Sequence, residues 1–374
     1  MGNKHSIKSI HSDKLKLLYN KALSSQKTND DQQALSYYTQ ALHEIQSTDN
    51  TSQDIYQIQH NIFLHICDIY IRQYNITLAK KFINKALQVA EELQEQDKIS
   101  ECLGRRGEIK RLEGDYDAAL LDHNKSVEIK LKIDKNKGFN ASNSYFNIGN
   151  VYNDQGKYAD AVVMYEKSLK IELLALGENY PSIATTYHNI GNAYKNQGKY
   201  DDAVSMYEKS LKIKLIVLGD NHPSIATTYN NIGSVYNDQG KYDDAVTMYE
   251  RSLKIKLSTL GHNHPSIATT YNNIGSIYNH QGKYDDAILF YERAVAILVD
   301  ANLQNHPNLV TLYSNIAFCY DKQNRPDDAK KMRKKSNDVR SSLGQVDTMN
   351  QLSTNVINPS QGIRNIYIFD FLTS

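Results

Sequence analysis

The feature that most constrains this chain is a sequence repeat with a period of 42 residues. Four of its six prolines keep this spacing: Pro181, Pro223, Pro265 and Pro307. Two series of glycines keep it as well, one from Gly107 to Gly275 and one from Gly114 to Gly282. A fixed period of this length predicts one repeated supersecondary unit, because each copy buries its apolar face only against its neighbours. The 374 residues are therefore expected to form one elongated array, although length alone suggests two or three globular domains.

One copy of the repeat, residues 223–260, has the pattern of two amphipathic helices. Its apolar residues recur every three or four positions on both sides of Gly240, as on a helix with one buried face. Pro223 suits the first position of a helix, where its missing N–H has no intrahelical partner. Gly240 suits the left-handed conformation that ends a helix, and Asp243 and Asp244 suit the positive end of the next one. The unit is predicted to be a helical hairpin.

Small residues indicate the number of hairpins. An alanine followed seven positions later by Ala or Ser puts two small residues on one face of a helix, where another helix can approach closely. The pair occurs eight times: Ala34/Ala41, Ala79/Ala86, Ala119/Ser126, Ala161/Ser168, Ala203/Ser210, Ala245/Ser252, Ala287/Ala294 and Ala329/Ser336. The first two steps between these alanines are 45 and 40 residues, and the later steps are 42. We therefore expect about eight hairpins, the first two of them degenerate.

The repeat resembles the tetratricopeptide repeat (TPR). The residues that carry this resemblance are Tyr229, Ile232, Gly233, Tyr236, Ala245, Tyr249 and Ser252. The 42-residue length and a linker of the form Leu-Gly-x-x-His-Pro, found at 218–223 and 260–265, are similar to the repeats of kinesin light chains. The resemblance covers about residues 11–340. It implies an all-α fold, an α-solenoid of about eight hairpins that winds as a right-handed superhelix.

Three segments follow from this pattern. Residues 1–10 are expected to be an N-terminal arm with a myristoylation motif, and residues 11–340 the solenoid, with regular 42-residue repeats over 139–340. Residues 341–374 are predicted to be a tail that is largely disordered, because much of it is polar, and that ends in an apolar stretch at 363–372.

Composition narrows the function classes. The 43 basic and 42 acidic residues give a formal charge of +1, which excludes the broad positive field of non-specific nucleic-acid binding. No stretch is long and apolar enough to predict a membrane-spanning helix. Cys67, Cys102 and Cys319 lie far apart without the spacing of a disulfide framework or zinc site, which favours a reducing compartment. We expect a cytoplasmic protein whose partners are proteins.

Sequence patterns that resemble catalytic or metal sites have a simpler explanation in the repeat. Gly191 to Lys199 resembles a phosphate-binding loop, but the glycine spacing is wrong and the string recurs in neighbouring copies, where it suits a helix cap. His222, His264 and His306 each precede a proline and lie one repeat apart, which favours a capping role over metal binding. Because hairpins account for about residues 11–340, we expect no enzyme, no metal and no cofactor.

The resemblance implies that partners bind in a concave groove, which in the TPR family is lined by the first helix of each repeat. Carried onto this chain, the groove has one asparagine row with the 42-residue spacing and further amides beside it. The candidate partner-binding residues are Asn147, Asn189, Asn231, Asn273 and Asn315, with Asn150, Asn192, Lys195, Asn230, Asn237, Asn272 and Asn279. Only Lys195 among them is basic, so a strongly acidic ligand is not favoured.

Two interpretations of the asparagine row stay open. Asparagine lowers helix stability relative to alanine, so some contact must offset its repeated use. The amides could form a ladder that joins neighbouring hairpins. Alternatively, they could bind the backbone of an extended peptide, because an amide both donates and accepts without carrying charge.

These patterns predict a non-catalytic interaction scaffold that binds a peptide segment in its groove. One alternative, implied by the resemblance, is a kinesin-light-chain-like cargo adaptor of a microtubule motor, with kinesin heavy chain as its partner. A second is an adaptor tethered to a membrane by myristoylation of Gly2, since Ser6 follows at the motif's spacing; this would add a peripheral membrane location. The basic stretch 330–335 is interpreted as the solvated face of the last helix, with contact to an acidic surface as the alternative.

Overall fold

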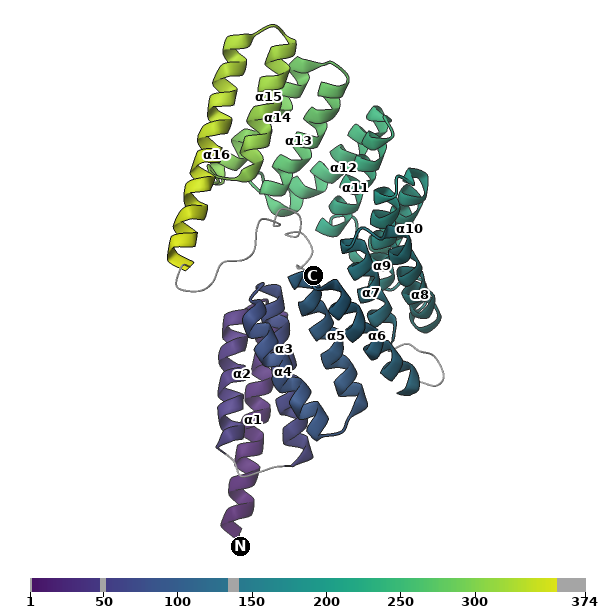
Figure 1. Cartoon of the computed structure of the whole chain (residues 1–374), viewed down its shortest axis with the longest axis vertical. Helices are drawn as coiled ribbons and strands as arrows, with labels where there is room; N and C mark the ends of the chain where they lie inside the picture. Colours follow the sequence, from purple (N-terminus) through teal and green to yellow (C-terminus); the bar gives the residue numbers. More distant parts are fainter. Residues whose placement is uncertain (1, 48–51, 134–140, 355–374) are drawn as a thin grey trace. The chain divides into compact units, whose positions relative to one another are not determined.

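A computed structural model describes residues 2–47, 52–133 and 141–354 (Figure 1). These residues form sixteen α-helices and no strand. The helices belong to two compact units, which divide between Ala175 and Leu176. None of the described helices is long and apolar enough to span a membrane.

The first unit contains four helical hairpins, each of two consecutive helices that pack on one another (Figure 1). The hairpins are α1 (Gly2–Lys27) with α2 (Asp31–Gln46), α3 (Gln53–Arg72) with α4 (Ile76–Glu92), α5 (Gln96–Glu113) with α6 (Tyr116–Ile133), and α7 (Ser142–Asp154) with α8 (Tyr158–Leu176).

The second unit contains four more hairpins. They are α9 (Pro181–Asn196) with α10 (Tyr200–Leu218), α11 (Pro223–Asp238) with α12 (Tyr242–Leu260), α13 (Pro265–His280) with α14 (Tyr284–Asp300), and α15 (Pro307–Lys322) with α16 (Pro326–Thr354). The prediction of an all-α solenoid of eight hairpins is confirmed. Helix α1 includes most of the expected N-terminal arm, and α16 continues to Thr354. The domain boundaries themselves stay a prediction. The apolar stretch 363–372 lies outside the described residues.

The turns inside the hairpins follow the predicted glycine series. Gly240 ends α11 with φ +73°, and the amide of Lys241 behind it donates to the carbonyl of Tyr236 at 2.8 Å. A left-handed residue at this point closes the helix by satisfying its last carbonyl groups. Asn324 has φ +56° at the equivalent turn of the last hairpin, and Tyr74 has φ +53° in a degenerate one.

The turns between hairpins use proline and histidine. Pro223, Pro265 and Pro307 are the first residues of their helices, as predicted. The Nδ1 atom of His222 accepts from the amide of Ser224 at 3.2 Å, and His264 and His306 repeat this contact two residues onward. The interpretation of these histidines as helix caps is confirmed.

The core is built from the small-residue face. Ala203 and Ser210 are fully buried in α10, and the Ser210 hydroxyl donates to the carbonyl of Ala184 in the same hairpin at 2.7 Å. Neighbouring hairpins meet through apolar clusters, for example Ala203, Val204 and Tyr207 of α10 with Ile232 and Val235 of α11. Each hairpin thus completes its core against the next one, as the repeat predicts.

Candidate functional site

Three predicted asparagines of the second unit form a ladder between first helices of successive hairpins. Nδ2 of Asn231 lies 3.1 Å from Nε2 of His188, and Asn273 donates to Oδ1 of Asn230 at 3.4 Å. Asn315 donates to Oδ1 of Asn272 at 3.3 Å. Each pair is 43 residues apart, which joins an asparagine to the residue just before its counterpart in the preceding hairpin. The ladder interpretation is confirmed for these three pairs.

The first pair fixes the protonation state of its histidine. An amide NH₂ group only donates, so Nε2 of His188 must accept and the imidazole must be neutral. Burial, together with the nearby Lys214 ammonium, lowers the pKa of His188 to about 3, so the ring is neutral at physiological pH.

The ladder leaves hydrogen-bonding capacity on its half-buried amides. Each contact uses a single N–H of Asn231, Asn273 or Asn315. Within the described residues no group donates to the Oδ1 atoms of these three side chains, and their second N–H has no acceptor. The surface therefore presents a neutral row of amide donors and acceptors, which matches the chemistry of an unpaired peptide backbone.

Asn147 and Asn189 continue the row without a ladder contact. The residues 43 positions before them are Gly104 and Phe146, which offer no side-chain hydrogen-bonding atom. Both asparagines are half-buried, and neither side chain has a hydrogen bond to any residue that the structure describes. The ladder therefore depends on the residue type at the preceding position and not on asparagine alone.

A second set of predicted residues is held by the core tyrosines. The hydroxyl of Tyr207 donates to Oδ1 of Asn192 at 2.6 Å, and Tyr165 donates to Asn150 at 2.8 Å. These tyrosines are buried, which raises the pKa of their phenols and keeps them as donors. The tyrosines thereby orient Asn150 and Asn192 from within their own hairpins. These two contacts use the Oδ1 atoms and not the NH₂ groups.

The other predicted residues have individual contacts. The Lys195 ammonium lies 2.6 Å from the Ser234 hydroxyl and 3.5 Å from the Asp238 carboxylate, so its charge is partly balanced. The Cys319 thiol donates to Oδ1 of Asn279 at 3.7 Å. The Oδ1 atom of Asn237 is buried without a hydrogen-bond partner among the described residues.

In the third hairpin, the position equivalent to the asparagine row carries a charged residue in place of an amide. Arg105 stands 42 residues before Asn147 and makes two hydrogen bonds to the carboxylate of Asp68, at 2.8 and 3.1 Å. The pair Tyr19 and His65 lies 3.2 Å apart between the first two hairpins. Sequence reasoning missed these contacts because Asp68 and His65 lie in the second repeat, which departs from the 42-residue spacing.

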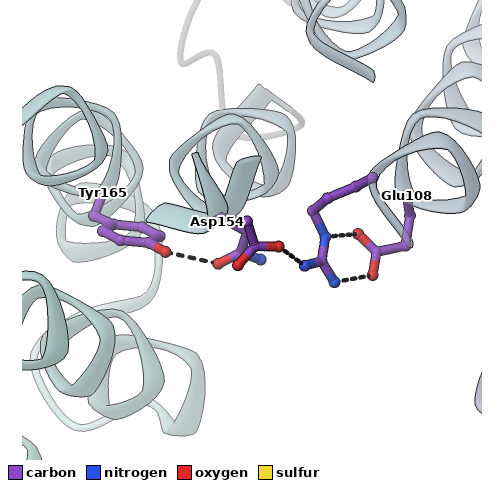
Figure 2. A network of polar contacts seen from close by, with 5 residues as sticks. Glu108, Asp154 and Tyr165 are labelled. Atoms are coloured by element: carbon purple, nitrogen blue, oxygen red, sulfur yellow. Dashed lines mark hydrogen bonds and ion pairs between the residues drawn. The ribbon is translucent and has the colours of Figure 1, made fainter. Parts of the chain in front are cut away.

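Figure 2 shows a network of polar contacts in the first unit. Arg111 of α5 makes two hydrogen bonds to Glu108, at 2.8 and 2.7 Å, and reaches Asp154 of α7 with its third nitrogen (Figure 2). The hydroxyl of Tyr165 from α8 reaches Asn150 on the same helix as Asp154 (Figure 2). The Arg111 guanidinium holds the pKa of Glu108 below its usual value despite burial. The Arg111 guanidinium offsets one of the two carboxylate charges, and the contacts together join α5, α7 and α8.

Buried lysines in the second unit were also missed. The Lys214 ammonium donates to the Thr228 hydroxyl at 3.0 Å and lies 3.4 Å from the carbonyl of Ser224. Burial lowers the pKa of Lys214 to about 8. Lys256 repeats the contact with Thr270 at 3.2 Å. The signal was present, because Lys214 follows Ser210 by four residues and Tyr207 by seven, on the buried face.

All three cysteines are buried. Burial raises the pKa of Cys67 and Cys102 to about 12 and that of Cys319 to about 11, which keeps the thiols protonated and weakly nucleophilic. Among the described residues no group of three His, Cys, Asp or Glu side chains is placed to hold a metal ion.

Comparison with known proteins agrees with this geometry. Tetratricopeptide repeat models match residues 140–216, 224–300 and 188–256. The crystal structure of BtubC (BKLC) from P. vanneervenii is similar, with 19% identity, a TM-score of 0.53, and coverage of 68% of this chain and 98% of that one. The apo form of RapI is similar with 15% identity, a TM-score of 0.56, and coverage of 77% and 99%. None of the curated proteins matches the chain.

A third similar structure is a putative kinesin light chain of Podosopora anserina with nearly identical TPR-like repeats. It is 22% identical, with a TM-score of 0.48 and coverage of 54% of this chain and 95% of that one.

The fold defines a class, the helical-hairpin solenoids, whose members display an extended surface for other proteins. Within that class, residues 140–300 of the chain are tetratricopeptide repeats. Repeats of this kind make it a protein-interaction scaffold.

Proposed function

We propose that this scaffold binds an extended segment of a partner protein along the first helices α9, α11, α13 and α15, through the side-chain amides of its asparagine row. The proposal rests on the amide atoms that the ladder contacts leave unused. Oδ1 and one N–H remain on Asn231, Asn273 and Asn315, at the same position of consecutive hairpins. A row of this kind supports binding of successive peptide groups, because each amide offers one donor and one acceptor.

The charge of the surface favours a peptide that is not strongly acidic. Lys195 is the one basic residue among the candidates, and Asp238 lies 3.5 Å from it. The ladder itself is neutral, because its histidine stays unprotonated. Recognition would therefore rest on the peptide backbone and on side chains that fit between the amides.

A peptide selection tests the proposal directly. A phage library of random dodecapeptides is selected on the wild-type protein, and the enriched peptides are measured against a triple variant, Asn231→Ala, Asn273→Ala and Asn315→Ala. We expect binding at least tenfold weaker in the variant. The lost ladder contacts are long and half-buried, so each substitution should lower the free energy of unfolding by about 0.5–1 kcal/mol. We therefore expect the variant to stay folded.

The control variant carries Glu208→Ala, Glu250→Ala and Glu292→Ala. These glutamates have the same 42-residue spacing and are exposed on second helices. The control is expected to bind as the wild type does. Equal binding by the asparagine variant, with its helicity retained, would disprove the proposed groove.

The two alternative roles stay predictions. Gly2 is the first residue of α1, and intact-mass analysis of the protein from its natural host tests whether it is acylated. Co-purification with a kinesin heavy chain tests the motor-adaptor role.

A further inference from the structure

The outward face of the last helix, α16, is basic. Lys330, Lys331, Arg333, Lys334, Lys335 and Arg340 are all exposed within eleven residues, and the acidic residues between 326 and 340 are Asp327, Asp328 and Asp338. The side chains of Asp327, Lys330, Lys331, Arg333, Lys334 and Asn337 line an open hollow on this face. We call these residues and Arg340 the α16 basic face.

Three cations of the basic face occupy positions that are apolar and buried in the preceding hairpin. Ile288, Tyr291 and Leu298 of α14 stand 42 residues before Lys330, Arg333 and Arg340. They belong to one core cluster with Leu309, Leu312 and Ile316 of α15. In α14 this side of the helix therefore receives the first helix of the next hairpin. On α16 the same side corresponds to the surface that would receive a further helix. There Lys330, Arg333 and Arg340 replace the apolar residues of α14.

The cations exceed what a soluble end of a solenoid requires. A terminal repeat needs a polar outer face, which neutral or mixed charges supply equally well. Here Lys330 and Lys334 are four residues apart, as are Lys331 and Lys335, an arrangement that destabilises a helix by a few tenths of a kcal/mol per pair. The preceding helices carry a glutamate at the position of Lys334, namely Glu208, Glu250 and Glu292. An anionic partner would relieve this repulsion.

Internal partners cover part of this charge. Lys331 lies 3.5 Å from Asp328, and Arg333 pairs with Asp321. Lys330, Lys334 and Arg340 have no ion pair with any residue that the structure describes. Half-buried Met332 and Val339 lie among these cations in the sequence.

From this we infer that the α16 basic face is a docking surface for an acidic amphipathic helix of a partner protein, which packs on α16 as α15 packs on α14. The hollow and the place in the stack favour a helix, and the charge favours glutamate or aspartate opposite Lys330, Lys334 and Arg340. The chain's own residues 355–374 do not fit, because they contain one acidic side chain, Asp370, and one basic one, Arg364. This surface is separate from the asparagine row.

Two synthetic peptides test the inference. The first is an 18-residue helix of Glu, Leu and Ala with Glu at positions i, i+3, i+4 and i+7; the second has the same composition in an order without helical amphipathicity. Binding to the full chain is measured by fluorescence anisotropy at 50 and 200 mM salt. We expect the amphipathic peptide to bind at least tenfold more tightly than the reordered one, and more weakly at high salt.

A matched pair of variants locates the surface. Lys330→Glu with Lys334→Glu should weaken binding at least tenfold, whereas Lys212→Glu with Lys254→Glu, which changes the net charge equally on exposed positions of α10 and α12, should not. Circular dichroism confirms that both variants stay helical. The inference is overturned if neither peptide binds, if both peptides bind equally, or if both variants respond alike. Binding to phosphatidylserine vesicles with no binding of the amphipathic peptide would also overturn it and assign the face to a membrane.

Discussion

The imidazole of His123 lies directly against Gly107, so that a methyl group on Gly107 would come within 2.8 Å of its Cε1 and Nε2 atoms. Real Cβ atoms do not approach other atoms so closely. Tyrosines take the place of this histidine in later hairpins, at Gly149/Tyr165, Gly191/Tyr207, Gly233/Tyr249 and Gly275/Tyr291. The recurring glycine is therefore required by a large ring from the second helix of its own hairpin.

Gly107→Ala should lower the free energy of unfolding by about 1–3 kcal/mol, because the ring and the two helices must move apart. Gly104, three residues earlier in α5, has nothing within 4 Å of an added Cβ, so Gly104→Ala should raise stability by about 0.5–1 kcal/mol. Chemical denaturation of both variants measures the difference. A loss of stability of the same size at Gly104 would show that α5 tolerates neither change and that the ring is not the cause.

Tyr74 is predicted to be a strained turn residue. It has φ +53° and is 48% exposed, at a turn where the later hairpins carry glycine. An L-residue pays a penalty of about 1–2 kcal/mol in this region, so Tyr74→Gly should raise the unfolding free energy by about 1 kcal/mol. The neighbouring Gln73 has φ −81°, and Gln73→Gly should lower it instead. Thermal unfolding of the two variants should shift in opposite directions.

Lys214→Met should stabilise the second unit at pH 7 by about 1–3 kcal/mol, because it removes a charge that is buried without an acidic partner. Thr228 keeps its own hydrogen bond to the Ser224 carbonyl at 3.0 Å, so no buried hydroxyl proton loses its acceptor. The exposed Lys212 on the same helix is the control, and Lys212→Met should change stability little.

The same lysine gives a pH dependence of definite sign. Its pKa is about 8 when folded and 10.5 when unfolded, so between these values the unfolded chain binds the extra proton. Stability of the wild type should therefore rise as pH increases from about 8 to 10.5, and Lys214→Met should remove part of that rise. An unchanged slope in the variant would contradict the buried charge.

Buried histidines predict acid sensitivity in the first unit. Burial lowers the pKa of His60 and His123 to about 4, while the unfolded value is 6.5. The contribution of these neutral histidines to the free energy of unfolding is fully present above pH 6.5. It is lost as pH falls toward about 4, because only the unfolded chain then takes up protons at these side chains. For His123→Phe, the loss of stability between pH 7.5 and 5 should shrink by about 2 kcal/mol. Replacement of the exposed His43 by glutamine should leave that loss as in the wild type.

The repeat pattern was enough to predict the hairpins and their ends. Pro223 begins α11 and Gly240 closes it because proline and glycine restrict the backbone locally, whatever surrounds them. The buried pair Ala245 and Ser252 also follows from spacing alone, since seven residues always return to one side of a helix. These features depend on one helix or one turn.

The ladder could be named only as one of two interpretations, because its partners lie on different hairpins. The 43-residue offset between Asn273 and Asn230 depends on how far one hairpin is displaced along the next, which no local signal encodes. The Arg105 to Asp68 pair is harder still to foresee, since a degenerate repeat separates them by 37 residues. Both contacts are decided by the packing of one hairpin on the next.

The most direct test of the account is nuclear magnetic resonance of the asparagine side chains themselves. The NH₂ signals of Asn231, Asn273 and Asn315 are assigned by single Asn→Ala variants and followed while a selected dodecapeptide is added to saturation. We expect these three signals to move, because their free N–H groups bind the peptide backbone. Saturation by the peptide with all three signals unmoved would contradict it.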